Sequence, residues 1–523
     1  MMKKKALAFA LALMMALTLF GCTNGENPTQ APVDSDSPAA STSPDTPNTP
    51  EPQEDPKTIA VVGFSTSASL TDLSDVVEEI NNILTPATNT ILELDVGSTF
   101  ANYMEQMNLR FAAQEKLDWV LSGVHFNYSD NVTKGYFNPL NNLLAEYGHN
   151  IKEVIGEDFL GAARYTDGEI YGITQRRDLA AGWGVVYRKD LLDKYDLSVD
   201  DVTVAEDMEP IFEMVSQNED DLAMIHVVTN TGIARHLTPL ADMDPLGATD
   251  DVALLSPFDS TDIVFVPETP EYMQAVTKAR EWFENHYMFS SIGTDTTTSA
   301  DYMKNDRLFS FFNTYHANTY NQYKNTLGFD ETQLGVVKTS TMMATTSTVN
   351  VFLWCNPVFS ADPEAAMRFM DFFYGSEEMI NLLVWGIEGR HYVKRDDGYI
   401  EYPEGITRDT VGFNLNCAYL WADNFKNYIM AGDDKTVWER MEVDNRNSKL
   451  SNGLGFTFDV TNVKSEYALI TSVWGEYATA ISNGTVDPES TVPDYIDKMK
   501  AAGVDKVVAE KQRQFDLWLA SQQ

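Results

Sequence analysis

The stretch Lys57–Phe64, KTIAVVGF, decides the fold class of this 523-residue chain. Its apolar run begins at Ile59 and ends at Phe64, and Pro56 and Ser65 bound it. A short apolar run with such boundaries is typical of a strand that is buried on both faces. A strand of this kind belongs inside a sheet that helices cover.

The residues that follow alternate between helical and strand patterns. Apolar positions within 71–84 and 99–116 recur with the period of a helix, and the apolar runs at 90–96 and 117–122 predict strands. Strand–helix–strand alternation favours parallel strands joined by right-handed crossovers. The sequence therefore predicts an α/β fold.

Four large apolar residues, Phe100, Met104, Met107 and Phe111, share one face of the helix predicted at 99–116. Because a stripe at this spacing usually faces a core, we expect all four side chains to be core residues.

The same alternation recurs further along the chain, which is too long for one core and predicts two lobes. The later predicted elements are helices at 206–218, 270–287, from 362, at 376–386, at 463–482 and after 493, strands at 222–228, 307–312 and 349–355, and a hairpin at 391–402.

The formal net charge of −41 makes the surface strongly acidic. Such a surface repels nucleic acid and anionic lipid, and it disfavours polyanionic ligands. We therefore expect no nucleic-acid partner and favour neutral or cationic ligands.

The N-terminus has the pattern of a secretory signal peptide at 1–21. Three lysines at 3–5 precede an apolar run from Ala6 to Phe20, which is too short for a membrane-spanning helix. The run ends in Leu19-Phe20-Gly21-Cys22, which resembles a bacterial lipobox, in which the cysteine is lipidated. We expect lipidation of Cys22 and anchoring on the outer face of the cell membrane. The alternative is an ordinary cleaved signal with an incidental cysteine.

Residues 22–57 have the composition of a disordered tether. The part from Thr23 to Pro56 contains no aromatic residue, no lysine and no arginine, and it is rich in proline. Such a segment cannot bury enough apolar surface to offset the entropy of ordering. We expect it to hold the folded body away from the membrane.

The sequence lacks the short motifs that mark common catalytic or metal sites. None of the seven histidines falls in H-E-x-x-H, there is no C-x-x-C, and phosphate-loop, dinucleotide and serine-nucleophile motifs are absent. The stretch 242–253 begins like a calcium-binding loop, but Leu246 and Ala253 occupy ligand positions. We expect no catalytic residue, no metal and no cofactor, and hence no enzyme.

Cys355 and Cys417 are too few for a disulfide framework. Two buried free thiols are expected, and one disulfide bridge is the alternative.

The stretch Asp167–Leu192, DGEIYGITQRRDLAAGWGVVYRKDLL, contains two segments that resemble a known family. D-G-x-I-Y-G-I at 167–173 and Y-R-K-D-L-L at 187–192 are similar to the hinge region of the family 1 extracellular solute-binding proteins of bacterial ABC importers. FNPLNNLL at 137–144 resembles the family's element after the third strand. The stretches at 385–393, 454–466 and 501–519 resemble a lipoprotein subgroup, the LipO-like group, with its own C-terminal region.

The resemblance implies a two-lobed, periplasmic-binding-protein-like α/β fold of type II with a hinged ligand cleft between the lobes. We place the first lobe at 58–174 plus 346–390. The second lobe is placed at 175–345 plus 391–523, with a helical C-terminal region.

By analogy with the family, ligand-binding side chains follow strands in both lobes. Arginine and glutamine offer hydrogen-bond donors to hydroxyls or a carboxylate, and aromatic rings offer flat apolar faces. Each aromatic ring could instead belong to a core, and an arginine could pair with an acid across the hinge. The residues expected at the ligand are Ser65, Thr66, Phe126, Tyr128, Gln175, Arg176, Trp183, Tyr315 and Phe456.

The resemblance further implies a monomeric receptor that delivers a small-molecule solute to ABC permease subunits in the membrane. A sugar or oligosaccharide is favoured because the chain is rich in aromatic residues. A peptide ligand is the first alternative, a sensor for a membrane kinase the second, and a glycan-active enzyme the third.

Overall fold

The computed structural model describes residues 55–66, 70–227, 232–247, 250–294, 296–415 and 417–522. The predicted signal peptide, Cys22 and nearly all of the predicted tether lie outside the described residues. Within the described part of the chain, no helix has the length and apolar character needed to cross a bilayer.

The first sheet has the strand order β11-β3-β1-β2. Strands β1 (Lys57–Phe64), β2 (Thr90–Ser98) and β3 (Trp119–Ser122) are parallel, and β11 (Leu353–Cys355) is antiparallel to β3. The strands predicted from the apolar runs are therefore present and parallel, as the strand–helix alternation predicted. Every residue of β3 and β11 is buried.

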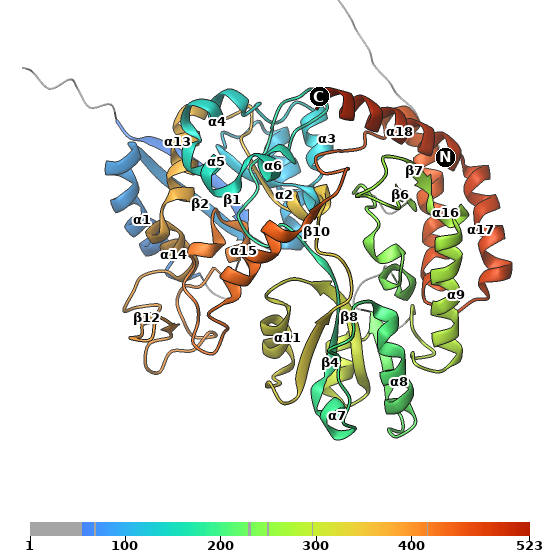
Figure 1. The fold of residues 1–523 in the computed structure, drawn as a ribbon. Coiled ribbons are helices and arrows are strands. Elements are labelled where there is room, and N and C mark those ends of the chain that lie inside the picture. The colour runs from blue at the N-terminus through green and yellow to red at the C-terminus, as the bar shows by residue number, and fades with distance from the viewer. Residues whose placement is uncertain are drawn as a thin grey trace, which may run out of the picture. The chain divides into compact units, whose positions relative to one another are not determined.

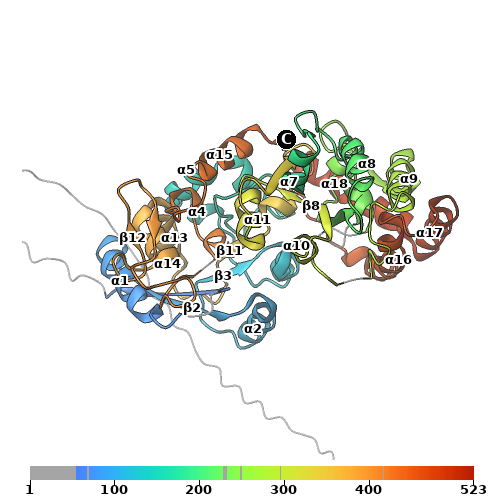
Figure 2. The same ribbon diagram turned by 90° about the horizontal axis from the view of Figure 1, so that it is seen from below.

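Helices cover this sheet and build the first core. α1 (Leu73–Thr88) packs against β2, α13 (Pro363–Gly375) and α14 (Glu377–Trp385), whereas α2 (Phe100–Ala112) packs against β1 and β2 (Figures 1 and 2). Short helices complete this part of the chain. They are α3 (Tyr128–Thr133), α4 (Asn141–Tyr147), α5 (His149–Ile155) and α6 (Glu157–Gly161).

The apolar stripe of α2 is only partly a core face. Met107 and Phe111 are buried together with Tyr103, but Phe100 is 44% exposed and Met104 is also exposed. The expectation that all four stripe residues lie in the core is therefore wrong for Phe100 and Met104. Phe100 is the first residue of the helix, so its side chain lies at the end of the sheet and not over its middle.

The second sheet has the order β5-β8-β4-β9. Strand β4 (Gly182–Arg188) is antiparallel to β8 (Leu308–Tyr315) and β9 (Leu334–Lys338), and β5 (Ala223–Val227) is parallel to β8. One face of this sheet packs in the second core, and the other face packs in a smaller hydrophobic cluster. The helices of this part are α7 (Lys189–Lys194), α8 (Glu209–Ser216), α9 (Pro270–Glu284), α10 (Ser299–Lys304) and α11 (Thr319–Leu327).

Three long helices end the chain and pack on the second core. α16 (Lys464–Ser482), α17 (Pro488–Ala502) and α18 (Val504–Ser521) contact one another, and the first two contact α9 (Figure 1). α18 also contacts β7 (Ile263–Phe265), which pairs with β6 (Val252–Leu254). The helical C-terminal region is thus confirmed, although α17 begins before Pro493.

Part of the segment after the hairpin packs in the first core, which differs from the expected lobe boundary. The hairpin itself is present as β12 (Val393–Lys394) and β13 (Ile400–Glu401). Beyond it, Phe413, Leu415 and Trp421 pack in the first core, although 391–523 was assigned to the second lobe. The Trp421 ring lies 4.7 Å from the Trp354 ring of β11. The remaining boundaries stay predictions.

The chain passes from the first core to the second through the extended segment 173–181. Ile173 pairs with Trp354, and Gly172 lies so close to β11 that an added Cβ would be 2.9 Å from Leu353 Cβ. α12 (Thr346–Val349) lies where the chain returns from the second sheet to β11. α15 (Val437–Asn447) also contacts the segment, because Asn445 accepts a hydrogen bond from the backbone N–H of Leu179. Cys355 and Cys417 are buried free thiols, as the cysteine count favoured.

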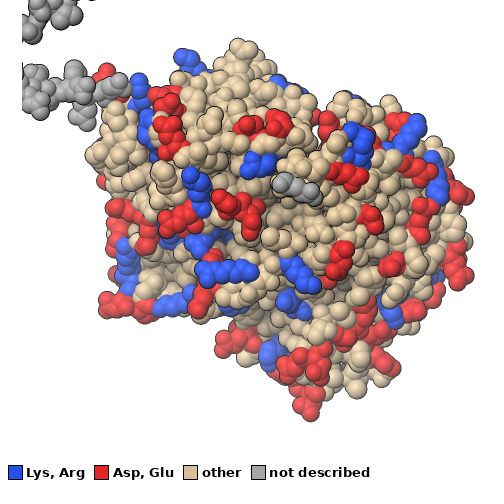
Figure 3. Space-filling model, turned by 45° about the horizontal axis from the view of Figure 1, so that its top comes forward, with Lys and Arg blue, Asp and Glu red and all other residues tan. Residues whose placement is uncertain are grey.

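The described surface carries the acidic excess that the composition predicts. Acidic side chains are spread over the face shown in Figure 3, with basic side chains between them. The whole chain has 78 Asp and Glu residues against 37 Lys and Arg residues, which supports the expectation that polyanionic ligands are disfavoured.

Gly123, directly after β3, gives a test of the packing between the first sheet and α12. Its φ of 113° disfavours any side chain, and an added Cβ would lie 2.5 Å from the carbonyl oxygen of Val351. We expect Gly123→Ala to lower the free energy of unfolding by about 1–3 kcal/mol, measured by urea denaturation. Gly135→Ala is the control, because Gly135 also has positive φ but no described atom lies within 4 Å of its added Cβ. Equal losses in the two variants would contradict the close approach.

Candidate functional site

The carboxyl ends of the parallel strands in the first sheet meet at one edge, where open α/β sheets commonly bind ligands. Phe100 follows β2, and His125 follows β3. Phe352 precedes the antiparallel strand β11, so it reaches the same edge. Tyr419 joins them from the short 3₁₀ turn Ala418–Leu420.

These four rings form what we call the aromatic platform: Phe100, His125, Phe352 and Tyr419. The ring of Phe352 lies 6.5 Å from that of Phe100, 5.6 Å from that of His125 and 5.7 Å from that of Tyr419. Phe100 and His125 are 5.5 Å apart. Phe100 is 44% exposed and Tyr419 39%, so the platform presents apolar ring surface to solvent. Contiguous exposed apolar surface of this kind marks a binding site.

A layer of buried rings supports the platform. Phe126 lies 5.4 Å from Phe100 and 6.0 Å from Phe352, and Phe64 lies 5.9 Å from Phe352. Because both supporting rings are buried in the first core, they fix the platform rings in place.

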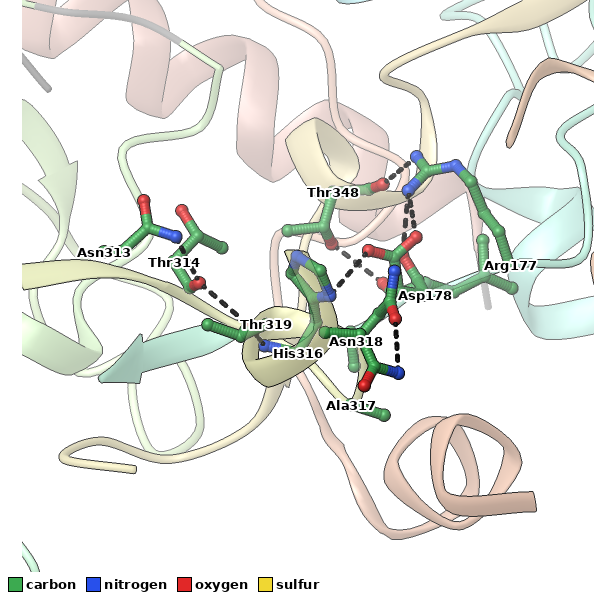
Figure 4. Close-up of polar contacts among 12 residues, drawn as sticks. Arg177, Asp178, Asn313, Thr314, His316, Ala317, Asn318, Thr319 and Thr348 are labelled. Atoms are coloured by element: carbon green, nitrogen blue, oxygen red, sulfur yellow. Dashed lines mark hydrogen bonds and ion pairs between the residues drawn. The ribbon is translucent and has the colours of Figure 1, made fainter. Parts of the chain in front are cut away.

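A polar cluster lies on the segment between the two cores (Figure 4). Arg177 donates from Nη1 to the carboxylate of Asp178 at 3.0 Å and from Nη2 to the carbonyl oxygen of Thr348 in α12 at 2.7 Å. His316, which follows β8, lies on the other side of this carboxylate, with Nδ1 3.7 Å from Asp178 Oδ2. Three separate stretches of chain therefore meet at Asp178.

The polar cluster and the platform act on each other electrostatically. Partial burial and, secondarily, the positive charge of Arg177 lower the pKa of His125 below its usual 6.5. Burial and the neighbouring Cys417 raise the pKa of Tyr419, and Arg177 opposes that rise. At neutral pH both rings are therefore uncharged.

The arrangement suits a ligand with an apolar face and hydroxyl groups. The platform offers ring surface, and the partly exposed Asp178 carboxylate offers acceptors whose direction the bond from the largely buried Arg177 fixes. Within the described ranges, no group of three or more His, Cys, Asp or Glu side chains could hold a metal ion.

Three of the sequence-predicted ligand residues lie at the platform edge. Phe126 is one of the supporting rings. Ser65 follows β1 and donates to the carbonyl oxygen of Leu415 at 3.1 Å, and Thr66 Oγ1 lies 3.5 Å from Cys417 Sγ. Thr66 is exposed, so its hydroxyl is accessible to a ligand.

Two more, Tyr128 and Phe456, line a separate cavity of about 310 Å³. Both rings are buried. Tyr128 donates to the carbonyl oxygen of Ala163 at 2.6 Å, and Phe456 packs against Phe515 at 5.0 Å. Their rings therefore serve mainly to pack the two cores.

The remaining four predicted residues are not brought to the platform. Arg176 forms ion pairs with Asp423 and Glu442 and lies over the Phe425 ring. This agrees with the alternative that an arginine of this segment pairs with an acid. Trp183 donates from Nε1 to the carbonyl oxygen of Ala241 and is half-buried.

Tyr315 is half-buried at the end of β8, and Gln175 is fully buried. Among the described residues, none provides a hydrogen-bond partner for either polar atom of the Gln175 side chain. None of these nine positions has been tested as a ligand contact, and they stay predictions.

The site residues that the sequence reasoning missed are Phe100, His125, Arg177, Phe352 and Tyr419. Phe100 and His125 could have been found by the rule that ligand residues follow parallel strands, because each lies within three residues of the end of its strand. Arg177 is adjacent to Arg176, which the sequence analysis proposed as a ligand residue. Tyr419 lies in an irregular stretch whose sequence shows no period.

A larger cavity of about 790 Å³ lies beside the second sheet and is the competing candidate site. Hydroxyl and charged side chains line it, among them Thr339, Ser340, Thr341 and Lys449. The ammonium group of Lys449 lies 4.7 Å from the Phe258 ring, which is the aromatic ring of its lining. Because the platform brings four rings together and this cavity has one, the platform offers the better stacking surface.

The chain resembles a known protein family. The family described as "Bacterial extracellular solute-binding protein" matches residues 87–380, which is more than half of the chain. The chain belongs to this family. A second match, "Domain of unknown function (DUF3502)", covers residues 452–520 and thus most of the C-terminal helices. Because the family is one of binding proteins, the expectation that the chain is not an enzyme is confirmed.

A relative of this solute-binding protein aligns with most of its length. A "Carbohydrate ABC transporter substrate-binding protein" of Streptococcus pneumoniae serotype 4 is 24% identical over 460 residues, which is 86% of this chain and 90% of the relative.

Two solved structures from Streptococcus pneumoniae share the fold. The N-glycan transport solute binding protein NgtS has a TM-score of 0.77 at 20% identity, covering 89% of this chain and 100% of that one. FusA in complex with kestose has a TM-score of 0.57 at 14% identity, covering the same shares. These similarities confirm the predicted mixed α/β, periplasmic-binding-protein-like fold.

Proposed function

We propose that this extracellular solute-binding protein captures a neutral oligosaccharide on the aromatic platform and delivers it to an ABC importer. The observation that carries the proposal is the exposed platform beside Arg177 and Asp178. Sugar rings have apolar faces that cover aromatic rings, and their hydroxyl groups need the donors and acceptors that a charged pair supplies.

Two further points support a neutral sugar. Arg177 is already neutralised by Asp178, so it does not favour an anionic ligand, and the acidic surface disfavours polyanions. The pneumococcal relative is named for carbohydrate transport, and NgtS has been crystallised in complexes with Man1GlcNAc and Man5GlcNAc.

A binding screen tests this proposal. We expect neutral oligosaccharides to raise the unfolding temperature of the purified protein, because a ligand at a hundred times its Kd stabilises the folded state by about 2.7 kcal/mol. Calorimetry of the best ligand should give a Kd in the micromolar range or tighter, equivalent to about 8 kcal/mol. Short peptides and uronate oligomers serve as comparison ligands. Stabilisation by peptides alone would replace the proposal with a peptide receptor.

We further propose that a lipid on Cys22 anchors the protein to the outer face of the cell membrane. The support is the lipobox-like Leu19-Phe20-Gly21-Cys22 and the tether composition of 22–57. Acyl chains on one residue hold a protein at a membrane without a spanning helix.

The anchor has a direct test. Cys22→Ala should move the protein from the membrane fraction into the culture medium, while its unfolding temperature stays unchanged because the composition of 23–56 predicts a tether between position 22 and the folded body. A membrane fraction that keeps the Cys22→Ala variant would mean that another segment anchors the chain.

A further inference from the structure

The 310 Å³ cavity adjoins the aromatic platform. Val124 lines this cavity and is the chain neighbour of His125 in the platform. On another side, Ser347 in α12 lines it, next to Thr348, whose carbonyl oxygen binds Arg177. The cavity, the platform and the polar cluster therefore share the same two stretches of chain.

The third wall of the cavity comes from the start of the C-terminal region. Thr457, Phe458 and Tyr467 line it, and they fall within the segment matched by the domain of unknown function. We call this cavity the C-terminal pocket. Thr346 Oγ1 donates to the carbonyl oxygen of Gly453 at 3.0 Å and accepts from the backbone N–H of Gly455 at 2.8 Å. These two bonds hold the C-terminal segment against α12.

The C-terminal pocket contains a buried acceptor without a partner. Asn350 Nδ2 donates to the carbonyl oxygen of Ala162 at 2.6 Å, which fixes the orientation of the amide. Among the described residues, none donates to Asn350 Oδ1, and Asn350 lines the pocket. Because this oxygen has almost no accessible surface in this structure, a water or ligand hydroxyl in the pocket can donate to it only after the pocket wall shifts.

The pocket also offers ring surface. Phe458 and Tyr467 are half-buried, with ring centroids 6.2 Å apart. The ammonium group of Lys511 lies 5.2 Å from the Phe458 ring centroid. The volume equals about ten water molecules at ~30 Å³ each, which is comparable to the size of one hexose.

We propose that the C-terminal pocket is a second sugar subsite and that the domain of unknown function serves as its wall. This inference rests on the proposed oligosaccharide function and deepens it. The platform binds one part of the ligand, and a further residue or branch of the same chain enters the pocket and donates a hydroxyl to Asn350 Oδ1. The ligand is therefore a longer or branched neutral oligosaccharide, and short sugars use the platform alone.

Filling the pocket tests this inference. Ser347→Phe places a ring in the pocket from α12, and Thr457→Phe does so from the C-terminal segment. Ser347→Ala is the matched control, since it removes the hydroxyl without filling space. Binding of neutral gluco-, manno- and galacto-oligosaccharides of one to six residues is measured by calorimetry for each variant, and thermal unfolding identifies any variant that fails to fold.

In the unchanged protein, affinity should rise at least tenfold from the shortest bound sugar to the longest. Either filling variant should remove this gain and leave the affinity of the shortest bound sugar within twofold, whereas Ser347→Ala should keep most of the gain. A length gain that survives in both filling variants would overturn the subsite and leave the proposed function intact, as would an equal loss at every length. Absence of binding by the unchanged protein at every length would overturn the proposed function and the subsite together.

Discussion

Replacing Phe100 and Tyr419 together by alanine should weaken oligosaccharide binding at least a hundredfold. Both rings are exposed, and their centroids lie 6.5 and 5.7 Å from that of Phe352. Truncation of an aromatic anchor at a binding site costs about 2 kcal/mol or more, and about 2.7 kcal/mol corresponds to a hundredfold change in Kd. Since both side chains are exposed in the free protein, their loss should barely change the free energy of unfolding.

Leu109→Ala is the matched control for this prediction. Leu109 lies on the same helix as Phe100 and is 67% exposed, but it makes no part of the platform. Its removal should leave the Kd unchanged. Calorimetry with the best ligand decides between the outcomes. If the double variant binds as tightly as the Leu109→Ala control, the ligand does not contact the platform.

Lys511→Met should lower the free energy of unfolding by about 3–5 kcal/mol, which is a large part of the stability of a typical protein. The Lys511 ammonium group is fully buried in α18. It donates to both carboxylate oxygens of Asp250, at 3.1 and 3.3 Å, and to the carbonyl oxygen of Val252 at 2.8 Å. Without the lysine, the buried carboxylate of Asp250 has lost its ion-pair partner.

The location of this ion pair explains why the expected loss is large. Asp250 and Val252 belong to the stretch 242–253 that begins like a calcium loop, and here an ammonium group from the C-terminal helix lies against it. Burial lowers the pKa of Lys511, and the charge of Asp250 opposes that shift. The pair therefore joins α18 to the second core, and removing one partner should loosen both.

Two further variants serve as controls for the Lys511→Met prediction. Lys506→Met removes a lysine from the same helix that pairs with Glu466 at 2.9 Å on the surface, and such pairs contribute about 0–1 kcal/mol. Asp250→Asn combined with Lys511→Met removes both charges and should recover part of the loss. Urea denaturation gives the three values. A loss for Lys511→Met no larger than that for Lys506→Met would contradict the role of the buried pair.

The first sheet was predictable because its strands leave a simple pattern. Ile59 to Phe64 and the run at 117–122 are buried on both faces, so their sequences are nearly continuous apolar runs. The helix α1 likewise places Val76, Ile80 and Leu84 at helical spacing against the sheet. Burial and period coincide in these elements, which is the condition under which sequence patterns succeed.

The platform was not predictable from the same patterns. Phe100 has the spacing of a core residue, and only its place in the first turn of α2, beyond the end of the sheet, exposes it. Arg176 and Arg177 are adjacent in an extended segment, where successive side chains point to opposite sides. The sequence alone could not tell which of the two faces the acids at Asp423 and Glu442.

The contribution of Tyr419 depends on contacts that are distant in the sequence. It reaches the platform because the segment around Phe413 to Trp421 packs into the first core, far along the chain from β1 and β3. No local period marks that segment, so its assignment to the second lobe was the natural error.

A crystal structure of the protein with its best-bound oligosaccharide tests most directly whether the platform binds the sugar. We expect a sugar ring within about 4 Å of the Phe100 or Tyr419 ring, with hydroxyl groups bonded to Arg177 or Asp178. A sugar bound in the cavity beside Ser340 and Lys449, with the platform still facing solvent, would contradict it.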